Sequence, residues 1–216
     1  MPHAHIDHIV ITASSLAAGA EYIRRHLGVV PGSGGEHPRM GTHNLLMRLG
    51  ENVYLEVIAV NPEAQQPERP RWFELTEHDD QPTRLAGWVA RSSDINAAAQ
   101  ASLLPLGPVE TMTRGSLTWQ ITIPEDGKFI MDGAAPALIQ WEAEQHPASR
   151  MEDAGCSLIS LDVFHPDANL LQEQLNKIGF NGPVNVSGVD AQEAPYLIAR
   201  INTPSGPRQL DSREAL

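Results

Sequence analysis

The stretch His5–Leu16, HIDHIVITASSL, predicts a short strand that runs into a helix. Its middle is apolar and β-branched, as strands are. Ser14 or Ser15 can then cap the helix, which would end at Gly28 in the position where glycine often closes a helix. His8 lies in the strand where a side chain should be buried. An ionisable ring at such a position needs either a polar partner or a function.

The same order of strand, cap, helix and stop occurs twice more. Leu85–Arg91 is a second apolar strand followed by Asp94 as a cap, and Leu158–Phe164 is a third followed by Asp167. Three copies of one start-and-stop pattern indicate internal duplication.

Strand-like runs follow the first two helices. These runs are Asn44–Leu49, Val53–Val60, Val109–Thr113, Ser116–Ile123 and Ala137–Trp141. They give the order βαβββ twice. The predicted divisions are 1–62 for the first module, 80–145 for the second, which forms one domain with the first, 155–204 for a partial third βαββ unit and 205–216 for a tail.

Composition limits the classes of partner. The chain has 216 residues and a formal net charge of −12, which disfavours binding to nucleic acid or to anionic lipid. No apolar run approaches the length of a membrane span, and the single cysteine, Cys156, excludes an internal disulfide framework. We therefore expect a cytoplasmic protein whose partner is a small molecule. The unpaired sheet edge of a short third unit would also permit a homodimer.

Several short pieces of the sequence carry a family resemblance. They are Ile6–Ile11, Leu27–Gly32, His37–Asn44, Tyr54–Glu56, Leu85–Trp88 and Leu138–Trp141. With the tandem βαβββ order, they resemble the glyoxalase-like domain group of the vicinal oxygen chelate superfamily, which includes glyoxalase I, extradiol dioxygenases and bleomycin-resistance proteins. The resemblance implies an α+β fold in which paired βαβββ modules form a curved mixed sheet around a cleft. One such fold supports many reactions, so it does not imply a particular one.

The resemblance also implies a metal site. A divalent ion in such a cleft is held by residues from the first and last strands of each module, and the first module supplies His8 and Glu56. An imidazole nitrogen and a carboxylate oxygen suit Zn²⁺, Fe²⁺, Mn²⁺ or Ni²⁺. Additional ligands could come from His43, His5 or His37, although the glycines near His37 favour a surface loop there.

The second module departs from this pattern. Counting back from its helix cap puts Gly87 or Trp88 in the place of His8, and aligning the last strands puts Gln140 opposite Glu56. None of the three replaces a metal ligand well. Water or substrate oxygens would have to complete the coordination.

Candidate substrate-binding residues come mostly from the second module. Trp88 and Trp119 would give a ligand pocket an apolar wall, although strand tryptophans also pack in cores. Arg48 and Arg91 could clamp a carboxylate or a phosphate, and Gln140 could donate or accept a hydrogen bond.

Two classes of function follow. In the first, the protein is a metal-dependent lyase, isomerase or dioxygenase that acts on a substrate with vicinal oxygens, and Glu56 also serves as a base. In the second, the cleft binds or sequesters a small ligand without metal, and His8 and Glu56 are a structural polar pair. Incomplete metal ligands favour the second class, whereas the presence of both His8 and Glu56 favours the first.

Overall fold

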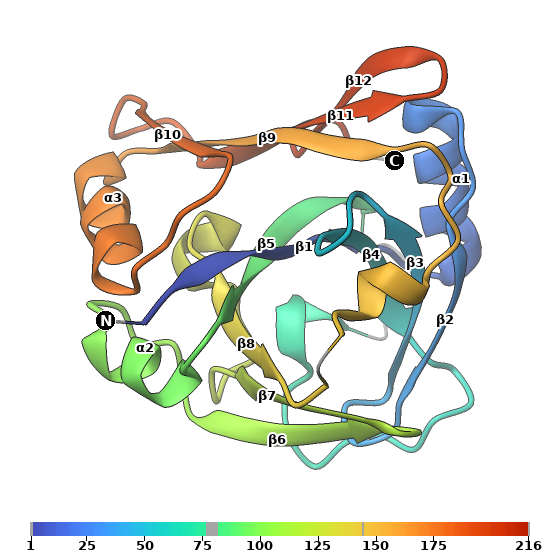
Figure 1. Ribbon diagram of the computed structural model, residues 1–216, viewed down its shortest axis with the longest axis horizontal. Coiled ribbons are helices and arrows are strands. Elements are labelled where there is room, and N and C mark those ends of the chain that lie inside the picture. The colour runs from blue at the N-terminus through green and yellow to red at the C-terminus, as the bar shows by residue number, and fades with distance from the viewer. Residues whose placement is uncertain (1, 77–81, 144, 216) are drawn as a thin grey trace.

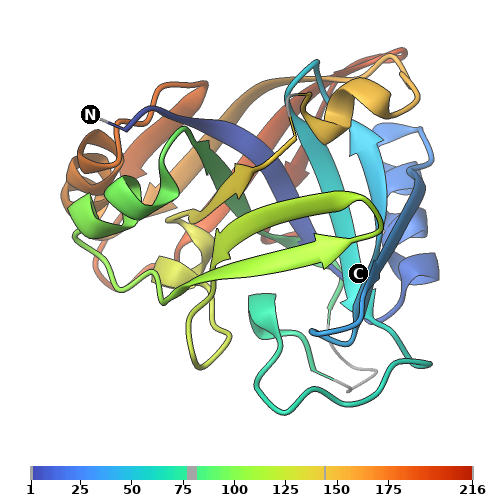
Figure 2. The same cartoon turned by 60° about the horizontal axis from the view of Figure 1, so that its bottom comes forward.

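A curved eight-stranded sheet forms the body of the molecule. The computed structural model describes residues 2–76, 82–143 and 145–215; positions 80 and 81 of the predicted second module lie outside these ranges. The strands are β1 (Ala4–Thr12), β2 (Gly32–His37), β3 (Thr42–Arg48), β4 (Tyr54–Val60), β5 (Arg84–Ser92), β6 (Val109–Arg114), β7 (Leu117–Thr122) and β8 (Ala137–Trp141). Their order is β2-β3-β4-β1-β5-β8-β7-β6. The end strands β2 and β6 contact each other, so the sheet nearly closes around an axis (Figure 2).

The sheet consists of two equivalent halves. β1 pairs in parallel with β4, β5 pairs in parallel with β8, and the antiparallel pair β1–β5 joins the halves. Each half also contains a helix, α1 (Leu16–Leu27) or α2 (Ile95–Ala101). The predicted tandem βαβββ modules and their curved mixed sheet are confirmed.

The helix boundaries follow from local chemistry. The Ser15 hydroxyl accepts a hydrogen bond from Ala18 N at 3.1 Å, and the Asp94 carboxylate accepts one from Ala97 N at 3.0 Å. Gly28 closes α1 with a φ of 74°, a left-handed conformation that favours glycine.

The third unit differs from the first two. It contains β9 (Ser157–His165), α3 (Ala168–Lys177), β10 (Val184–Gly188), β11 (Tyr196–Thr203) and β12 (Gly206–Asp211). Its strand order is β10-β9-β11-β12, so β10 pairs directly with β9 and the connectivity of the modules is not repeated. Two sequence predictions are therefore wrong here: the unit is not a third copy, and residues 206–211 of the predicted tail are a strand. A turn at Gly206, with φ of 99°, lets β12 fold back on β11.

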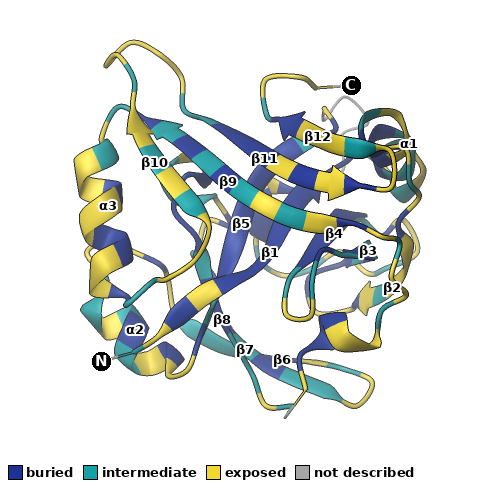
Figure 3. Cartoon of the chain, turned by 45° about the horizontal axis from the view of Figure 1, so that its top comes forward, coloured by how far each residue is buried: buried dark blue, intermediate teal, exposed yellow. Residues whose placement is uncertain are grey.

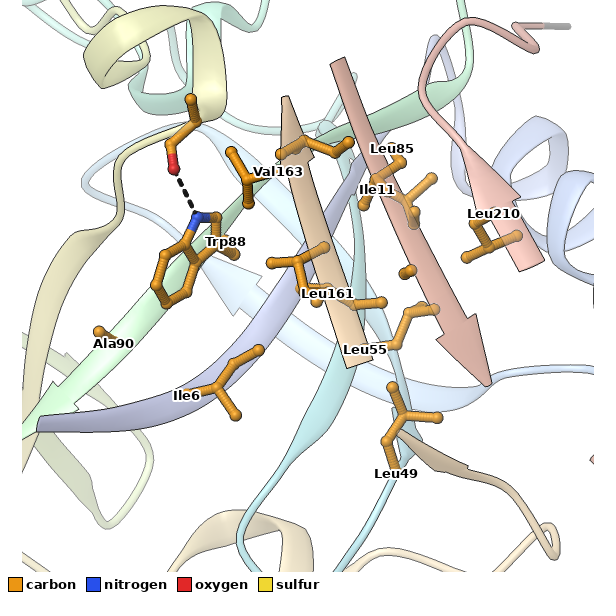
Figure 4. Packing of buried hydrophobic residues seen from close by; sticks show 14 of the residues in the cluster. Ile6, Ile11, Leu49, Leu55, Leu85, Trp88, Ala90, Leu161, Val163 and Leu210 are labelled. Atoms are coloured by element: carbon orange, nitrogen blue, oxygen red, sulfur yellow. Dashed lines mark hydrogen bonds between the residues drawn. The ribbon is translucent and has the colours of Figure 1, made fainter. Parts of the chain in front are cut away.

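The second sheet covers the outer face of the first (Figure 1). Leu161 and Val163 of β9 pack with Ile9, Ile11 and other outward-facing residues of the large sheet in one buried cluster, shown in part in Figure 4. Figure 3 shows that the covered strands β1 and β5 are largely buried, whereas exposed positions recur along β9. Within the described residues, β10 and β12 form the edges of this sheet, and the homodimer stays a prediction.

The inner face encloses a smaller apolar cluster. Val10, Val89 and Ile139 point inward from three strands and pack with Trp72 and Phe73. The last two belong to the short helical turn η1 (Trp72–Glu74); two more such turns are η2 (Ile130–Gly133) and η3 (Pro147–Arg150). In the part of the chain that the structure describes, no helix is both long and apolar enough to cross a membrane.

Candidate functional site

His8 and Glu56 come together inside the curved sheet. In the parallel ladder of β1 and β4, His8 lies beside Tyr54, and Glu56 follows two positions later on the same face. The rings of His8 and Tyr54 stack with 4.5 Å between their centroids, and His8 Nε2 lies 3.5 Å from Glu56 Oε2. Both side chains are buried. The structure thus brings the two predicted ligands together, while their role stays a prediction.

A buried carboxylate holds the other nitrogen of His8. Asp7 is fully buried, and its Oδ1 accepts a hydrogen bond from His8 Nδ1 at 2.7 Å. Its Oδ2 accepts hydrogen bonds from Trp141 Nε1 at 3.0 Å and from His146 Nε2 at 2.9 Å. The sequence analysis missed Asp7 and His146. Two adjacent polar residues in an otherwise apolar strand were the available signal.

His146 is fixed in one tautomer by its two partners. Its Nε2 donates to Asp7, and its Nδ1 accepts a hydrogen bond from Ala148 N at 3.2 Å. A ring with one donating and one accepting nitrogen is neutral. Asp7 therefore has a single candidate cation among these partners, namely His8.

Glu56 has its own supporting contacts. Asn44 Nδ2 donates to Glu56 Oε1 at 2.5 Å, and Asn44 Oδ1 accepts from Gly35 N at 2.8 Å and from Arg114 Nη1 at 3.3 Å. Arg114 Nη1 also lies 3.2 Å from His37 Nε2, which accepts the hydrogen bond. The carboxylate is thus connected through one amide to a guanidinium group.

His37 lies in this site and not on a surface loop, so the expectation of a loop is wrong. It ends β2 and is buried, with its ring edge against Trp72 at a centroid distance of 5.1 Å. The neighbouring glycines give the other side chains room: a Cβ at Gly34 would lie 2.0 Å from Asn44 Oδ1, and one at Gly35 would lie 2.8 Å from Arg114 Cδ. The glycines reflect close packing here.

Electrostatics make His8 and Glu56 an ion pair. Burial alone would lower the pKa of His8, but hydrogen bonds and charge from Asp7 and Glu56 raise it to about 9. Burial alone would raise the pKa of Glu56, but His8 and its other partners lower it to about 2. Burial lowers the pKa of His37 to about 4, and nearby Arg114 contributes to that shift. At neutral pH the site therefore holds two carboxylates, one imidazolium and one neutral imidazole.

The space between these groups is small. A cavity of about 30 Å³ is lined by His8, His37, Glu56, Trp119 and Trp141, among other residues. This volume is comparable to that of one water molecule. Trp119 therefore contacts the site as predicted for a pocket wall, and a larger ligand requires some lining side chains to move.

Four of the predicted site residues lie elsewhere. His5 is exposed, and its Nδ1 bonds to the carbonyl oxygen of Asn181 at 2.7 Å. His43 belongs to a cavity on the outer side of the sheet, beside the start of α1. Trp88 packs in the outer core and donates to Ala134 O at 2.9 Å, as Figure 4 shows. Arg48 donates to Gly50 O at 3.2 Å. The predictions that these residues join the cleft are wrong.

Strand register identifies the true counterparts of His8 and Glu56 in the second module. Val89 pairs with Ala137 as His8 pairs with Tyr54, and Ile139 follows two positions later as Glu56 does. Both Val89 and Ile139 face inward. The alignment of Gln140 with Glu56 was wrong by one position. Gln140 Oε1 instead accepts a hydrogen bond from Ile95 N at 2.7 Å, at the start of α2.

The geometry fits two metal ligands from the protein. Two donors with bonds of about 2.1 Å to a tetrahedral ion lie about 3.4 Å apart, close to the observed separation of His8 Nε2 and Glu56 Oε2. A carboxylate on the far nitrogen of a ligating histidine is also a common supporting contact, and Asp7 provides it. Over residues 2–76, 82–143 and 145–215, however, no group of three or more His, Cys, Asp or Glu side chains is placed to hold a metal.

The tandem modules and their shared concave face are those of the vicinal oxygen chelate superfamily. Within it, the chain belongs to the glyoxalase-like domain family, whose model matches residues 6–179. None of the curated proteins that were compared matches the chain significantly.

Solved structures agree with this fold at low sequence identity. A hypothetical protein from Staphylococcus aureus shares 19% identity at a TM-score of 0.55, with 81% of this chain and 74% of that chain covered. A Streptomyces coelicolor methylmalonyl-CoA epimerase variant in complex with 2-nitronate-propionyl-CoA shares 19% identity at a TM-score of 0.43, covering 64% and 97%. The Mn(II)-bound glyoxalase from Novosphingobium aromaticivorans shares 6% identity at a TM-score of 0.49, covering 100% and 85%.

Proposed function

We propose that this protein is a metal-dependent lyase or isomerase that acts on a small substrate with vicinal oxygens. The observation that carries the proposal is the approach of His8 Nε2 and Glu56 Oε2 to 3.5 Å, inside a cavity, with His8 Nδ1 held by Asp7. Because the ring is oriented through Nδ1, Nε2 is the nitrogen that faces the cavity. A merely structural pair does not need a cavity at this point.

His8 and Glu56 would hold the ion, and the substrate would supply two further oxygens. Bound there, a divalent cation stabilises negative charge that develops on a substrate oxygen. Binding requires His8 to release its proton, so the metal competes with protons for this site. Extradiol-type iron chemistry is less well supported, because two imidazoles and one carboxylate are its usual ligands and His37 Nε2 is occupied by Arg114.

The surrounding residues would divide the remaining work. Glu56 can accept a proton from a substrate carbon, since Asn44 occupies only one of its two oxygens. Arg114 supplies a positive charge beside Asn44 and favours an anionic substrate. Trp119 and Ile139 restrict water around the reacting atoms.

A metal-free binding protein is the second candidate. It is favoured by Val89 and Ile139, the apolar side chains that replace the ligands of the second module. In that case the ion pair of His8 and Glu56, together with Arg114, would recognise a polar ligand directly.

Metal binding distinguishes the two candidates. We expect Zn²⁺, Mn²⁺, Fe²⁺ or Ni²⁺ to bind in a 1:1 ratio in calorimetric titrations of the purified protein. The double variant His8→Ala, Glu56→Ala should lose this binding, and the control variant His43→Ala should keep it. Binding of none of the four ions, or equal binding to the double variant, would rule out the metal-dependent enzyme and leave the binding protein.

A further inference from the structure

A second, larger cavity lies on the other side of Trp141 and His146 from the His8 site. It has a volume of about 410 Å³, and its walls come from β1, β5, β8 and the segment that follows β8. The lining residues are His3, His5, Asn52, Arg91, Ser92, Ser93, Gln140, Trp141, Ala143 and His146. Such a volume is sufficient for a small organic molecule.

The chemistry of this cavity favours an anion. Nearly all its lining side chains can donate a hydrogen bond, and Asp and Glu are missing from the described residues that line it. Arg91 supplies a formal positive charge, and no ion pair to it occurs in the described part of the chain. A basic cavity on a chain with a net charge of −12 runs against the overall field, which otherwise repels anions.

Arg91 has a position suited to an anchor. It lies on β5 opposite His5 of β1, and it is half-buried, so its stem is supported while its guanidinium group faces the cavity. Gln140 Oε1 is taken by Ile95 N, which leaves the NH₂ group of Gln140 for a ligand. A planar guanidinium can bind a carboxylate or phosphate through two parallel hydrogen bonds.

The two cavities share a wall. Trp141 lines both, and Trp141 and His146 each donate a hydrogen bond to Asp7, the carboxylate that holds His8. A ligand in the larger cavity therefore contacts side chains that are one hydrogen bond away from Asp7.

We propose that this cavity is a binding site for a small organic anion, a carboxylate- or phosphate-bearing molecule, with Arg91 as its charged anchor. The proposal does not depend on a metal at His8 and Glu56. It also gives Arg91 and Gln140 the ligand-binding role expected from the sequence, in a cavity separate from the cleft.

Calorimetric titrations with inorganic phosphate and, separately, with malonate test the proposal at constant ionic strength set by chloride. We expect saturable binding of at least one anion. Arg91→Ala and Arg91→Gln should each weaken it by about tenfold or more, since a charge-assisted double contact is lost. Arg91→Lys should retain part of the affinity. The matched control Arg208→Ala, which removes an exposed arginine on β12, should change it by less than about twofold.

The two probes also separate the ligand types. Tighter phosphate binding would indicate a phosphorylated ligand, and tighter malonate binding would indicate a carboxylic acid. Absence of saturable binding of both anions to the native chain would overturn the proposal. Unchanged affinity in Arg91→Gln, with an unfolding transition equal to that of the native chain, would overturn it as well.

Discussion

Asp7 and His8 are neighbours in the chain, yet their side chains bond to each other inside the sheet, with 2.7 Å between Asp7 Oδ1 and His8 Nδ1. Successive strand residues normally point to opposite faces. The pairing of β1 with β5 shifts its register between Ile6 and His8, and such a bulge changes the direction of a side chain. This irregularity in β1 supplies His8 with the carboxylate that orients it.

Asp7→Asn should lower the pKa of His8. The substitution removes the negative charge next to Nδ1 and leaves the buried imidazolium with Glu56 alone, so the free energy of unfolding should fall by roughly 3 kcal/mol. Nuclear magnetic resonance titration of the His8 ring and urea unfolding would measure the two effects. Asp162→Asn is the matched control, because Asp162 is ion-paired to Arg200 on the outer sheet. An unchanged His8 pKa in Asp7→Asn would contradict the role assigned to Asp7.

Much of the fold was predictable because its signals are local. Apolar strands, serine or aspartate caps and closing glycines are read from adjacent residues, and they located α1, α2 and their flanking strands. The third unit had the same local signals but a different partner for β10. Pairing between strands depends on contacts across the whole sheet, so local patterns did not reveal it.

The site was predictable only in part for the same reason. His8 and Glu56 lie on regular strands, and alternation placed them on one face. Asp7 needs a bulge, and His146 comes from a connecting segment that reaches the site only after the chain folds. Gln140 was misplaced because counting from a helix cap does not fix the register of the strand.

Stability should decrease between neutral and alkaline pH. The pKa of His8 in the folded protein, about 9, lies above its ordinary value of 6.5, so the folded state holds this proton more tightly. The resulting stabilisation is complete below pH 6.5 and is lost as the pH rises to about 9. The free energy of unfolding should fall by an amount on the order of 3 kcal/mol over this interval. Urea unfolding at several pH values measures it, and His8→Gln should flatten the curve. A native profile as flat as that of the variant would refute the ion pair.

Gly34→Ala should disrupt the support of Glu56. The added Cβ would lie 2.0 Å from Asn44 Oδ1, which forces the Asn44 amide away from the carboxylate. We expect a loss of roughly 2 kcal/mol in the free energy of unfolding and a higher Glu56 pKa. Gly32→Ala is the matched control, since a Cβ there meets only Leu46 O at 3.6 Å. Equal stabilities of the two variants would show that the close approach of Asn44 to Gly34 is unimportant.

Ile139→Glu should strengthen metal binding by installing a third ligand. Ile139 takes the place in the second module that Glu56 takes in the first, and it lines the cavity that contains His8. Without metal, the new buried carboxylate should destabilise the protein by a few kcal/mol. Added Zn²⁺ or Mn²⁺ should restore stability, and affinity for the ion should rise by about tenfold or more. Thermal unfolding with and without metal measures both effects. Leu138→Glu places the same charge on the opposite, equally buried face, so it should be destabilised without rescue by metal. Rescue of both variants, or of neither, would contradict the assignment of this concave position as the vacant ligand site.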